Sequence, residues 1–206
     1  MPFLCLLVFF AAYLLGNLNG AVVVSKLVSK EDVRTKGSGN AGLTNFVRNY
    51  GAATSVFVIL IDVGKAVLAC LIGGWLLNGY GYYEEGVALG ALGVILGHDF
   101  SVLLDFKGGK GILSGVTVAL MMDWRLGLLV FGIFLVAYLL TGFVSLGSVL
   151  SSGSFGFFYC FFHWGKWFPI VVGFFLSFLI VWMHRGNIQR LLKGEERKTN
   201  LLKKDK

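Results

Sequence analysis

Charged residues are scarce in this 206-residue chain: Asp, Glu, Lys and Arg make up 14% of it, whereas a soluble domain carries about 25%. Hydrophobic residues make up 56%, and the mean hydropathy is +0.78. The composition excludes an ordinary soluble domain and indicates a membrane protein. The length suits one helical bundle. We therefore expect a single integral membrane domain over residues 1–206, with a short charged tail from about residue 184.

Cysteine is also scarce. Cys5, Cys70 and Cys160 lie far apart in apolar runs, which excludes a disulfide framework and a metal-binding spacing. The sequence lacks H-E-x-x-H and G-x-S-x-G as well, and nothing in it resembles a glycine-rich nucleotide-binding fold. We therefore expect no metal and no cofactor. The apolar run at the start of the chain has no basic segment before it and no clear cleavage site, so we expect a retained helix and not a signal peptide.

The basic residues are unevenly distributed. The formal net charge is +7, and most Lys and Arg fall within residues 26–48 and 185–206. This grouping is typical of the cytoplasmic loops of a membrane protein. It does not indicate a nucleic-acid-binding face, so we expect no nucleic-acid partner.

Long apolar runs predict the membrane helices, because crossing the hydrocarbon takes about 20 apolar residues. Six runs are clear candidates: 3–24, 52–76, 87–104, 126–142, 145–162 and 167–183. A seventh run, 112–122, is too short to be assigned by length alone. If it is counted and the N-terminus lies outside, fifteen Lys and Arg fall in the cytoplasm and two outside, with Lys65 inside a helix.

The charge distribution therefore predicts an all-α bundle of about seven transmembrane helices, with the N-terminus outside and the C-terminus cytoplasmic. This topology places four polar segments at one cytoplasmic face. They are residues 36–49, 105–111, 145–148 and 184–197.

The first polar segment, "KGSGNAGLTNFVRNYG" at 36–51, combines glycines with hydrogen-bond donors. Glycines let a backbone turn sharply or approach a ligand closely, and the fork of an arginine suits phosphate oxygens. Asn45 and Arg48 would share one face if residues 43–50 are helical. The candidate site residues are Ser38, Asn40, Asn45 and Arg48. A polar connecting loop with a helix cap is the alternative.

The second segment, "DFKGGKGILSG" at 105–115, lacks the Walker A pattern. Successive small residues can still form an anion-binding nest of backbone N–H groups, and Lys110 would add a charge near a helix N-terminus. The candidates are Lys107, Gly108, Gly109, Lys110 and Gly111. A glycine turn with cytoplasmic lysines is the alternative.

The last two segments add Ser145 and Ser148 at a turn, and His184 and Asn187 three residues apart on one helix face. Local capping by the serines and headgroup binding by the basic tail are the alternatives.

Asp62 and Lys65 lie three apart inside the second predicted span, where they are placed to pair. Buried charges of this kind mark a function or a structural ion pair. For His98, we expect a structural role.

Five ordered segments of the chain resemble the motifs of the bacterial acyl-phosphate:glycerol-3-phosphate acyltransferase family. The family's G-S-G-N-x-G-A-T-N-x-x-R, D-x-x-K-G, G-H with F-K-G-G-K-G, V-S-L-x-S and H-R-x-N-I-x-R-L-x-x-G-x-E motifs correspond here to residues 37–48, 62–66, 97–111, 144–148 and 184–196. Leu43 and Ala66 replace the usual alanine and glycine.

The resemblance implies a seven-helix enzyme of the bacterial plasma membrane with its active site facing the cytoplasm. Such an enzyme transfers a fatty acyl group from acyl phosphate to the 1-hydroxyl of glycerol 3-phosphate, giving lysophosphatidic acid and phosphate for phospholipid synthesis. Its partners would be these two substrates and membrane lipid. By resemblance, the residues that contact the substrates would be Ser38, Arg48, Lys110, Ser148, His184 and Asn187.

An acyl phosphate is a mixed anhydride with a good leaving group, so the reaction needs anion clamps, orientation and oxyanion stabilisation. The candidate residues offer these parts but no obvious nucleophile–base pair. We therefore expect direct attack by the glycerol 3-phosphate hydroxyl, with His184 or a substrate phosphate oxygen as the base. The alternatives are a diverged paralogue with another substrate, a small-anion transporter and a lipid-binding relative without activity.

Overall fold

The computed structural model describes residues 1–198, and within them the secondary structure is entirely helical. Ten α-helices and two 3₁₀-helices follow one another in this part of the chain: α1 (Pro2–Gly16), α2 (Gly20–Ser29), η1 (Val33–Thr35), α3 (Leu43–Tyr50), α4 (Ala52–Asn78), α5 (Tyr83–Asp99), η2 (Val102–Leu104), α6 (Ile112–Met122), α7 (Trp124–Thr141), α8 (Val144–Phe162), α9 (Trp167–Met183) and α10 (Arg185–Leu192). The predicted all-α fold is confirmed. Lys203, Lys204 and Lys206, which the topology argument placed in the cytoplasm, lie outside the described residues.

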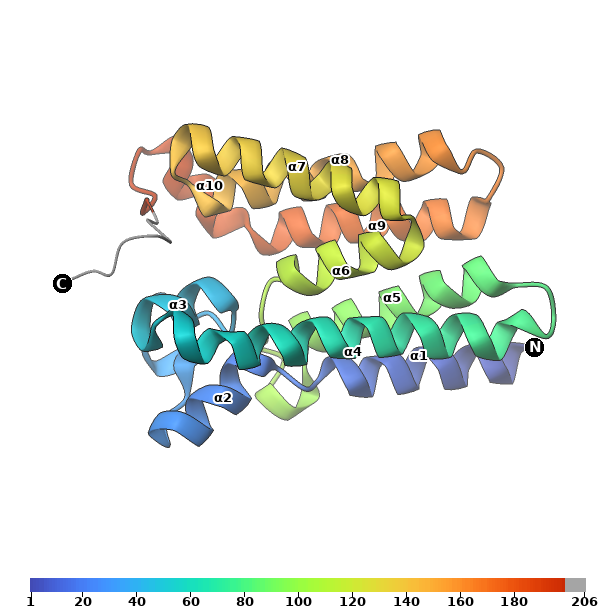
Figure 1. The fold of residues 1–206 in the computed structure, drawn as a ribbon, viewed down its shortest axis with the longest axis horizontal. Coiled ribbons are helices and arrows are strands. Elements are labelled where there is room, and N and C mark those ends of the chain that lie inside the picture. Colours follow the sequence, from blue (N-terminus) through green and yellow to red (C-terminus); the bar gives the residue numbers. More distant parts are fainter. Residues whose placement is uncertain (199–206) are drawn as a thin grey trace.

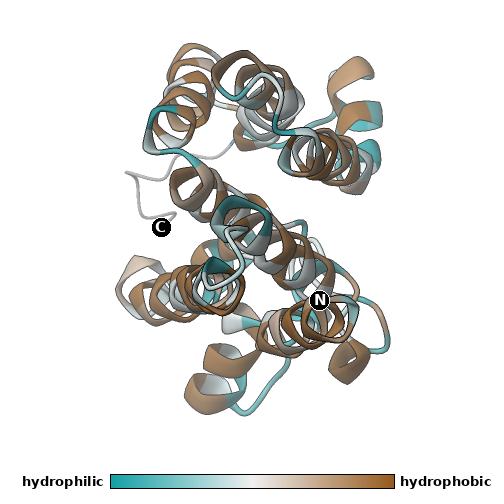
Figure 2. Ribbon diagram, turned by 90° about the vertical axis from the view of Figure 1, so that its right-hand side faces the viewer, coloured by the Kyte–Doolittle hydropathy of each residue, from teal (hydrophilic) through white to brown (hydrophobic). Residues whose placement is uncertain are grey.

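The long helices form two layers with the short helix α6 between them (Figure 1). One layer contains α1, α4 and α5, and the other contains α7, α8 and α9. The helices are apolar over most of their length (Figure 2). Glycines let α4 and α5 approach closely: a Cβ atom at Gly73 or at Gly86 would overlap the backbone of the other residue. Close backbone contact of this kind is how membrane helices gain packing energy without a hydrophobic driving force.

Within residues 1–198, five helical segments are long and apolar enough to cross a membrane, or six if the bent pair α9 and α10 is counted. Helix α6 has only 11 residues, so it is about 16 Å long, which is about half of the roughly 30 Å hydrocarbon core. The predicted runs after the first became helices close to their expected bounds. The number of spans and the orientation of the termini stay predictions.

The first predicted helix, 3–24, is broken in the structure. Helix α1 ends at Gly16 and α2 begins at Gly20, because the side-chain oxygen of Asn19 accepts a hydrogen bond of 3.1 Å from the backbone N–H of Val22. An asparagine in this position is a favoured N-cap. The apolar run continues through the break, so hydropathy alone did not reveal it.

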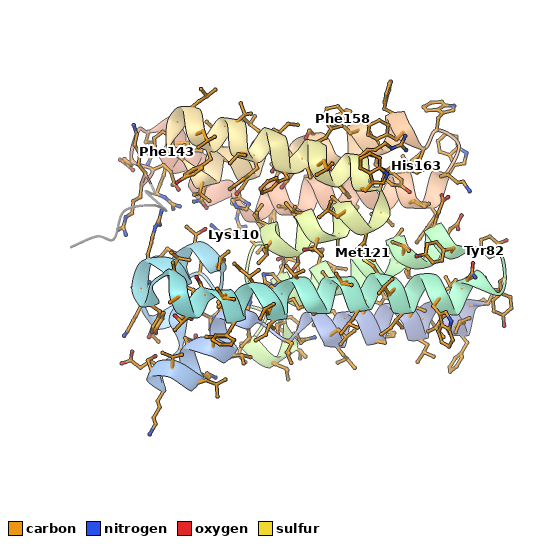
Figure 3. All side chains as sticks on the ribbon, in the orientation of Figure 1. Tyr82, Lys110, Met121, Phe143, Phe158 and His163 are labelled. Carbon is orange, nitrogen blue, oxygen red and sulfur yellow. The ribbon has the colours of Figure 1, made fainter. Side chains whose placement is uncertain are left out.

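The helices run from end to end of the molecule, and the polar segments gather at one end. Helices α2, α3 and α10 lie at this end (Figure 1), and Phe143 lies there too, whereas Tyr82 and His163 mark the opposite end (Figure 3). Lys110 lies between the two layers, on the side of the polar end (Figure 3). The four predicted segments thus meet at one end of the bundle.

Candidate active site

The first polar loop is organised by Asn45, which lies on α3. The side-chain amide of Asn45 donates to the carbonyls of Val33, Lys36 and Asn40, each at 3.1 Å, and its oxygen accepts from the N–H of Ser38 at 3.0 Å. The side chain is 2% exposed. Because both N–H bonds are directed at protein carbonyls, Asn45 holds the loop together. Its contact with substrate stays a prediction.

The predicted helix at 43–50 is confirmed as α3, and Arg48 follows Asn45 on it by three residues. Arg48 and Ser38 are exposed at the surface of the polar end, and Asn40 is half-buried. Gly37 has φ 60°, and a Cβ atom there would overlap the oxygen of Asn45. The loop therefore needs glycine at this position. Ser38, Asn40 and Arg48 stay substrate-contact predictions.

Arg34 joins this loop to the glycine-rich loop. Its guanidinium donates to the carbonyl of Leu104 at 3.0 Å and to that of Lys107 at 3.4 Å, and it holds both carboxylate oxygens of Asp32 at 2.8–3.2 Å. The sequence argument counted Arg34 only as a cytoplasmic charge. The sequence around a loop arginine does not predict which backbone carbonyls its guanidinium will bind.

The glycine-rich loop lies on the end of α5. The N–H of Gly108 donates to the carbonyl of Asp99, and the N–H of Gly109 to the carbonyl of His98, both at 3.1 Å. These two N–H groups are therefore directed at protein and not at a ligand. An anion-binding nest in this segment would therefore not include these two N–H groups. The N–H groups that begin α6, after Lys110, are the part of the segment placed as a helix N-terminus.

Lys110 reaches across the molecule to α10. Its ammonium group donates to the side-chain oxygen of Asn187, 77 residues further along the chain. The amide N–H of Asn187 donates at 2.8 Å to Glu196, and the guanidinium of Arg190 donates at 2.7 Å to the other oxygen of the same carboxylate. Two predicted site residues are thus in direct contact. Glu196 was quoted only as part of a motif, yet it fixes which end of the Asn187 amide faces Lys110.

The electrostatics of this cluster favour anion binding. Burial lowers the pKa of Lys110 to about 8, with further lowering by Arg190 and Arg185 and an opposing effect of Glu196. A phosphate oxygen beside Lys110 would stabilise the charged ammonium and so offset the effects of burial and of the two arginines. Burial alone would raise the pKa of Glu196, but the hydrogen bonds from Asn187 and Arg190 keep that pKa below its usual value.

His184 lies where α9 bends into α10. Its side chain is 4% exposed, and Nδ1 is 2.8 Å from the carbonyl of Ile180. A carbonyl only accepts, so Nδ1 carries the hydrogen and Nε2 is left with a lone pair. Burial lowers the pKa of His184 to about 4, against a raising effect of the Ile180 carbonyl, and Lys110 lowers it further. The ring is therefore neutral at neutral pH.

Ser145 and Ser148 are both buried in the first turn and a half of α8. The hydroxyl of Ser148 donates to the carbonyl of Val144 at 2.9 Å, which is the local bond that such serines often form. Its oxygen still has a lone pair for a donor on a substrate. Lys107, in contrast, is exposed, and Gly111 forms the buried, left-handed start of α6 with φ 67°.

The predicted pairing of Asp62 with Lys65 is confirmed at 2.7 Å, and both side chains are buried. The Lys65 ammonium also lies 2.7 Å from Nδ1 of His98, so the expected structural role of His98 is confirmed.

Comparison with known proteins identifies the family. The model of the family described as "Glycerol-3-phosphate acyltransferase" matches residues 6–194. A glycerol-3-phosphate acyltransferase of Prochlorococcus marinus (strain MIT 9301) is 36% identical over 199 residues, which is 95% of this chain and 98% of that protein. One of Thermoanaerobacter pseudethanolicus is 39% identical over 187 residues, 91% of each chain.

Two solved structures share the fold. Both are of PlsY, an integral membrane glycerol 3-phosphate acyltransferase, one in a glycerol 3-phosphate form and one in a lysophosphatidic acid form. Their TM-scores are 0.86 and 0.83, with 31% identity over 96% of each chain. The match extends over almost the whole length of this chain and of these relatives. The chain therefore belongs to the glycerol-3-phosphate acyltransferase family.

Proposed function

We propose that this protein transfers a fatty acyl group from acyl phosphate to the 1-hydroxyl of glycerol 3-phosphate, releasing lysophosphatidic acid and inorganic phosphate. The observation that carries the proposal is the contact between Lys110 and Asn187 beside a neutral His184. This cluster gathers a half-buried cation, an amide and an imidazole lone pair at the polar end of an apolar bundle. Such a place suits a substrate with a phosphate head and a hydrocarbon chain.

The roles of the residues follow from their chemistry. Lys110, Arg48 and the N–H groups at the start of α6 would hold the phosphates and stabilise the tetrahedral oxyanion. Ser38, Asn40, Ser145, Ser148 and Asn187 would orient the substrates. Gly108 and Gly109 would shape the loop, since their N–H groups are already bonded to protein.

The proton of the attacking hydroxyl needs an acceptor. Nε2 of His184 has the free lone pair, but a group with a pKa of about 4 holds a proton weakly. A phosphate group has a second pKa of about 6 and is the stronger base. We infer that His184 accepts the hydrogen bond that orients the hydroxyl, and that the proton passes on to a substrate phosphate oxygen.

The cytoplasm is the proposed location of the polar end, in the plasma membrane of a bacterium. Lys26, Lys30, Arg34 and Lys193 lie on segments at this end, while Glu84 and Glu85 begin α5 at the other. This distribution agrees with the preference of basic residues for cytoplasmic loops.

The direct test supplies the protein in sealed vesicles with palmitoyl phosphate and glycerol 3-phosphate. We expect phosphate and lysophosphatidic acid in equal amounts, with activity at once in inverted vesicles and only after permeabilisation in right-side-out vesicles. Lys110→Met should lower kcat/KM by about 10²-fold or more. Lys193 is an exposed lysine directly after α10, and Lys193→Met should leave kcat/KM unchanged. No product with wild-type protein, or product from acyl-CoA alone, would contradict the proposal.

Direct transfer predicts an isotope result. Among the described residues, no Ser, Thr or Cys side chain is hydrogen-bonded to a histidine, so we expect no acyl-enzyme. Incubation of the enzyme with acyl phosphate and radiolabelled phosphate, without glycerol 3-phosphate, should put no label into acyl phosphate beyond the rate without enzyme. Enzyme-dependent labelling would show a reversible acyl-enzyme and overturn direct transfer.

The pKa of Lys110 predicts the alkaline side of the pH profile. If the protonated ammonium binds phosphate, kcat/KM falls about tenfold per pH unit above the free-enzyme pKa of Lys110, which is about 8. Arg185, Arg190 and Glu196 are the charged groups that set this value. Lys110→Arg keeps the charge and should remove this limb, whereas Lys193→Arg should retain it. An identical limb in Lys110→Arg would show that another group titrates.

A further inference from the structure

The glycine loop that carries Lys110 rests on a buried histidine. The N–H groups of Gly108 and Gly109 donate to the carbonyls of Asp99 and His98, which are among the last carbonyls of α5. A Cβ atom at Gly109 would overlap Nε2 of His98, so the imidazole lies directly against the loop. The position of His98 therefore determines where the loop lies, one residue before Lys110.

His98 is in turn held by Lys65. The Lys65 ammonium lies 2.7 Å from Nδ1 of His98, 2.7 Å from Asp62 and 2.7 Å from the carbonyl of Leu18, with the carbonyl of Gly16 at 3.3 Å. An ammonium group only donates, so Nδ1 accepts and the ring hydrogen is on Nε2. Lys65 thus fixes the tautomer and the orientation of the ring, and it joins α4 to the end of α1 and to α5.

The segment after Lys110 is attached to the backbone of α4, the helix that carries Lys65. The hydroxyl of Ser114, in the first turn of α6, donates to the backbone carbonyl of Asp62 at 3.1 Å. The carboxylate of Asp62 accepts at 3.1 Å from the N–H of Gly20, at the start of α2. Lys110 therefore lies between two attached points, Gly109 before it and Ser114 after it.

We propose that Lys65 is a positioning residue for acyl transfer, which fixes the glycine loop before Lys110 through His98. Lys65 is 4% exposed and does not meet the substrate. The inference rests on the proposed function, because that function makes Lys110 the phosphate-binding group whose position matters. A misplacement of about 1 Å in a site of this kind can cost 10²-fold in rate.

The alternative is that Lys65 only neutralises the buried Asp62. Removal of one partner of a buried ion pair leaves an unpaired charge and destabilises a protein strongly, whereas removal of both partners often restores stability. Asp62→Asn keeps an oxygen for the N–H of Gly20. The double variant Asp62→Asn/Lys65→Met therefore removes the unpaired charge and the anchor of His98 together, which separates the two roles.

The experiment compares wild type, Lys65→Met, the double variant and Asp123→Asn. The last is a matched control, because Asp123 holds Arg125 and His163 in a second charged cluster at the opposite end of the molecule. Three quantities are measured in detergent: thermal stability, kcat/KM with palmitoyl phosphate and glycerol 3-phosphate, and the pKa of Lys110. The pKa of Lys110 is measured by ¹³C NMR of methylated lysines, and the Lys110 signal is assigned by its absence in Lys110→Arg.

We expect the double variant to regain the stability that Lys65→Met loses, yet to keep a kcat/KM lowered by about 10²-fold. Its Lys110 pKa should rise from about 8 toward the ordinary lysine value, while Asp123→Asn keeps the wild-type kcat/KM and Lys110 pKa. A double variant with wild-type kcat/KM and Lys110 pKa would overturn the proposal. The pKa measurement needs no substrate, so it tests Lys65 even if wild-type protein formed no lysophosphatidic acid, a result that would refute the function alone.

Discussion

A single ammonium group, that of Lys65, joins the parts of the molecule on which the site is built. It lies within hydrogen-bonding distance of Asp62 on its own helix, of the carbonyls that end α1, and of His98 near the end of α5. A buried charge is costly in an apolar bundle unless it is fully paired. The requirement to satisfy it therefore constrains α1, α4 and α5 together, and through His98 it constrains the glycine loop above them.

The chemistry of the site depends on this arrangement, because it determines which side chains lie together. Lys110 crosses from one helical layer to the other and meets Asn187, so the two layers share one cluster. Burial weakens the hold of Lys110 on its proton and keeps His184 neutral. A bound anion would offset the cost of the half-buried Lys110 cation. In this way a site without a metal-binding cluster or a nucleophile–base pair among the described residues can bind phosphate and favour acyl transfer.

The sequence predicted the helices because long apolar runs follow from the thickness of the membrane. It predicted the contact partners less well. The break at Asn19 depends on a side-chain cap within a continuous apolar run, and hydropathy does not detect it. Asn45 was assigned to substrate because it is polar and lies in a motif, yet its amide holds the loop. The N–H groups of Gly108 and Gly109 were predicted to bind an anion. In the structure they donate to carbonyls at the end of α5, which have no partner within the helix.

The central claim is that buried Lys65 holds the loop in place, and amide hydrogen exchange of residues 107–111 tests it most directly. In wild type, the bonded N–H groups of Gly108 and Gly109 should exchange slowly. In Asp62→Asn/Lys65→Met, the account predicts exchange faster by about tenfold or more in this loop, with α8 and α9 unchanged. Equal protection of the loop in the two proteins would contradict it.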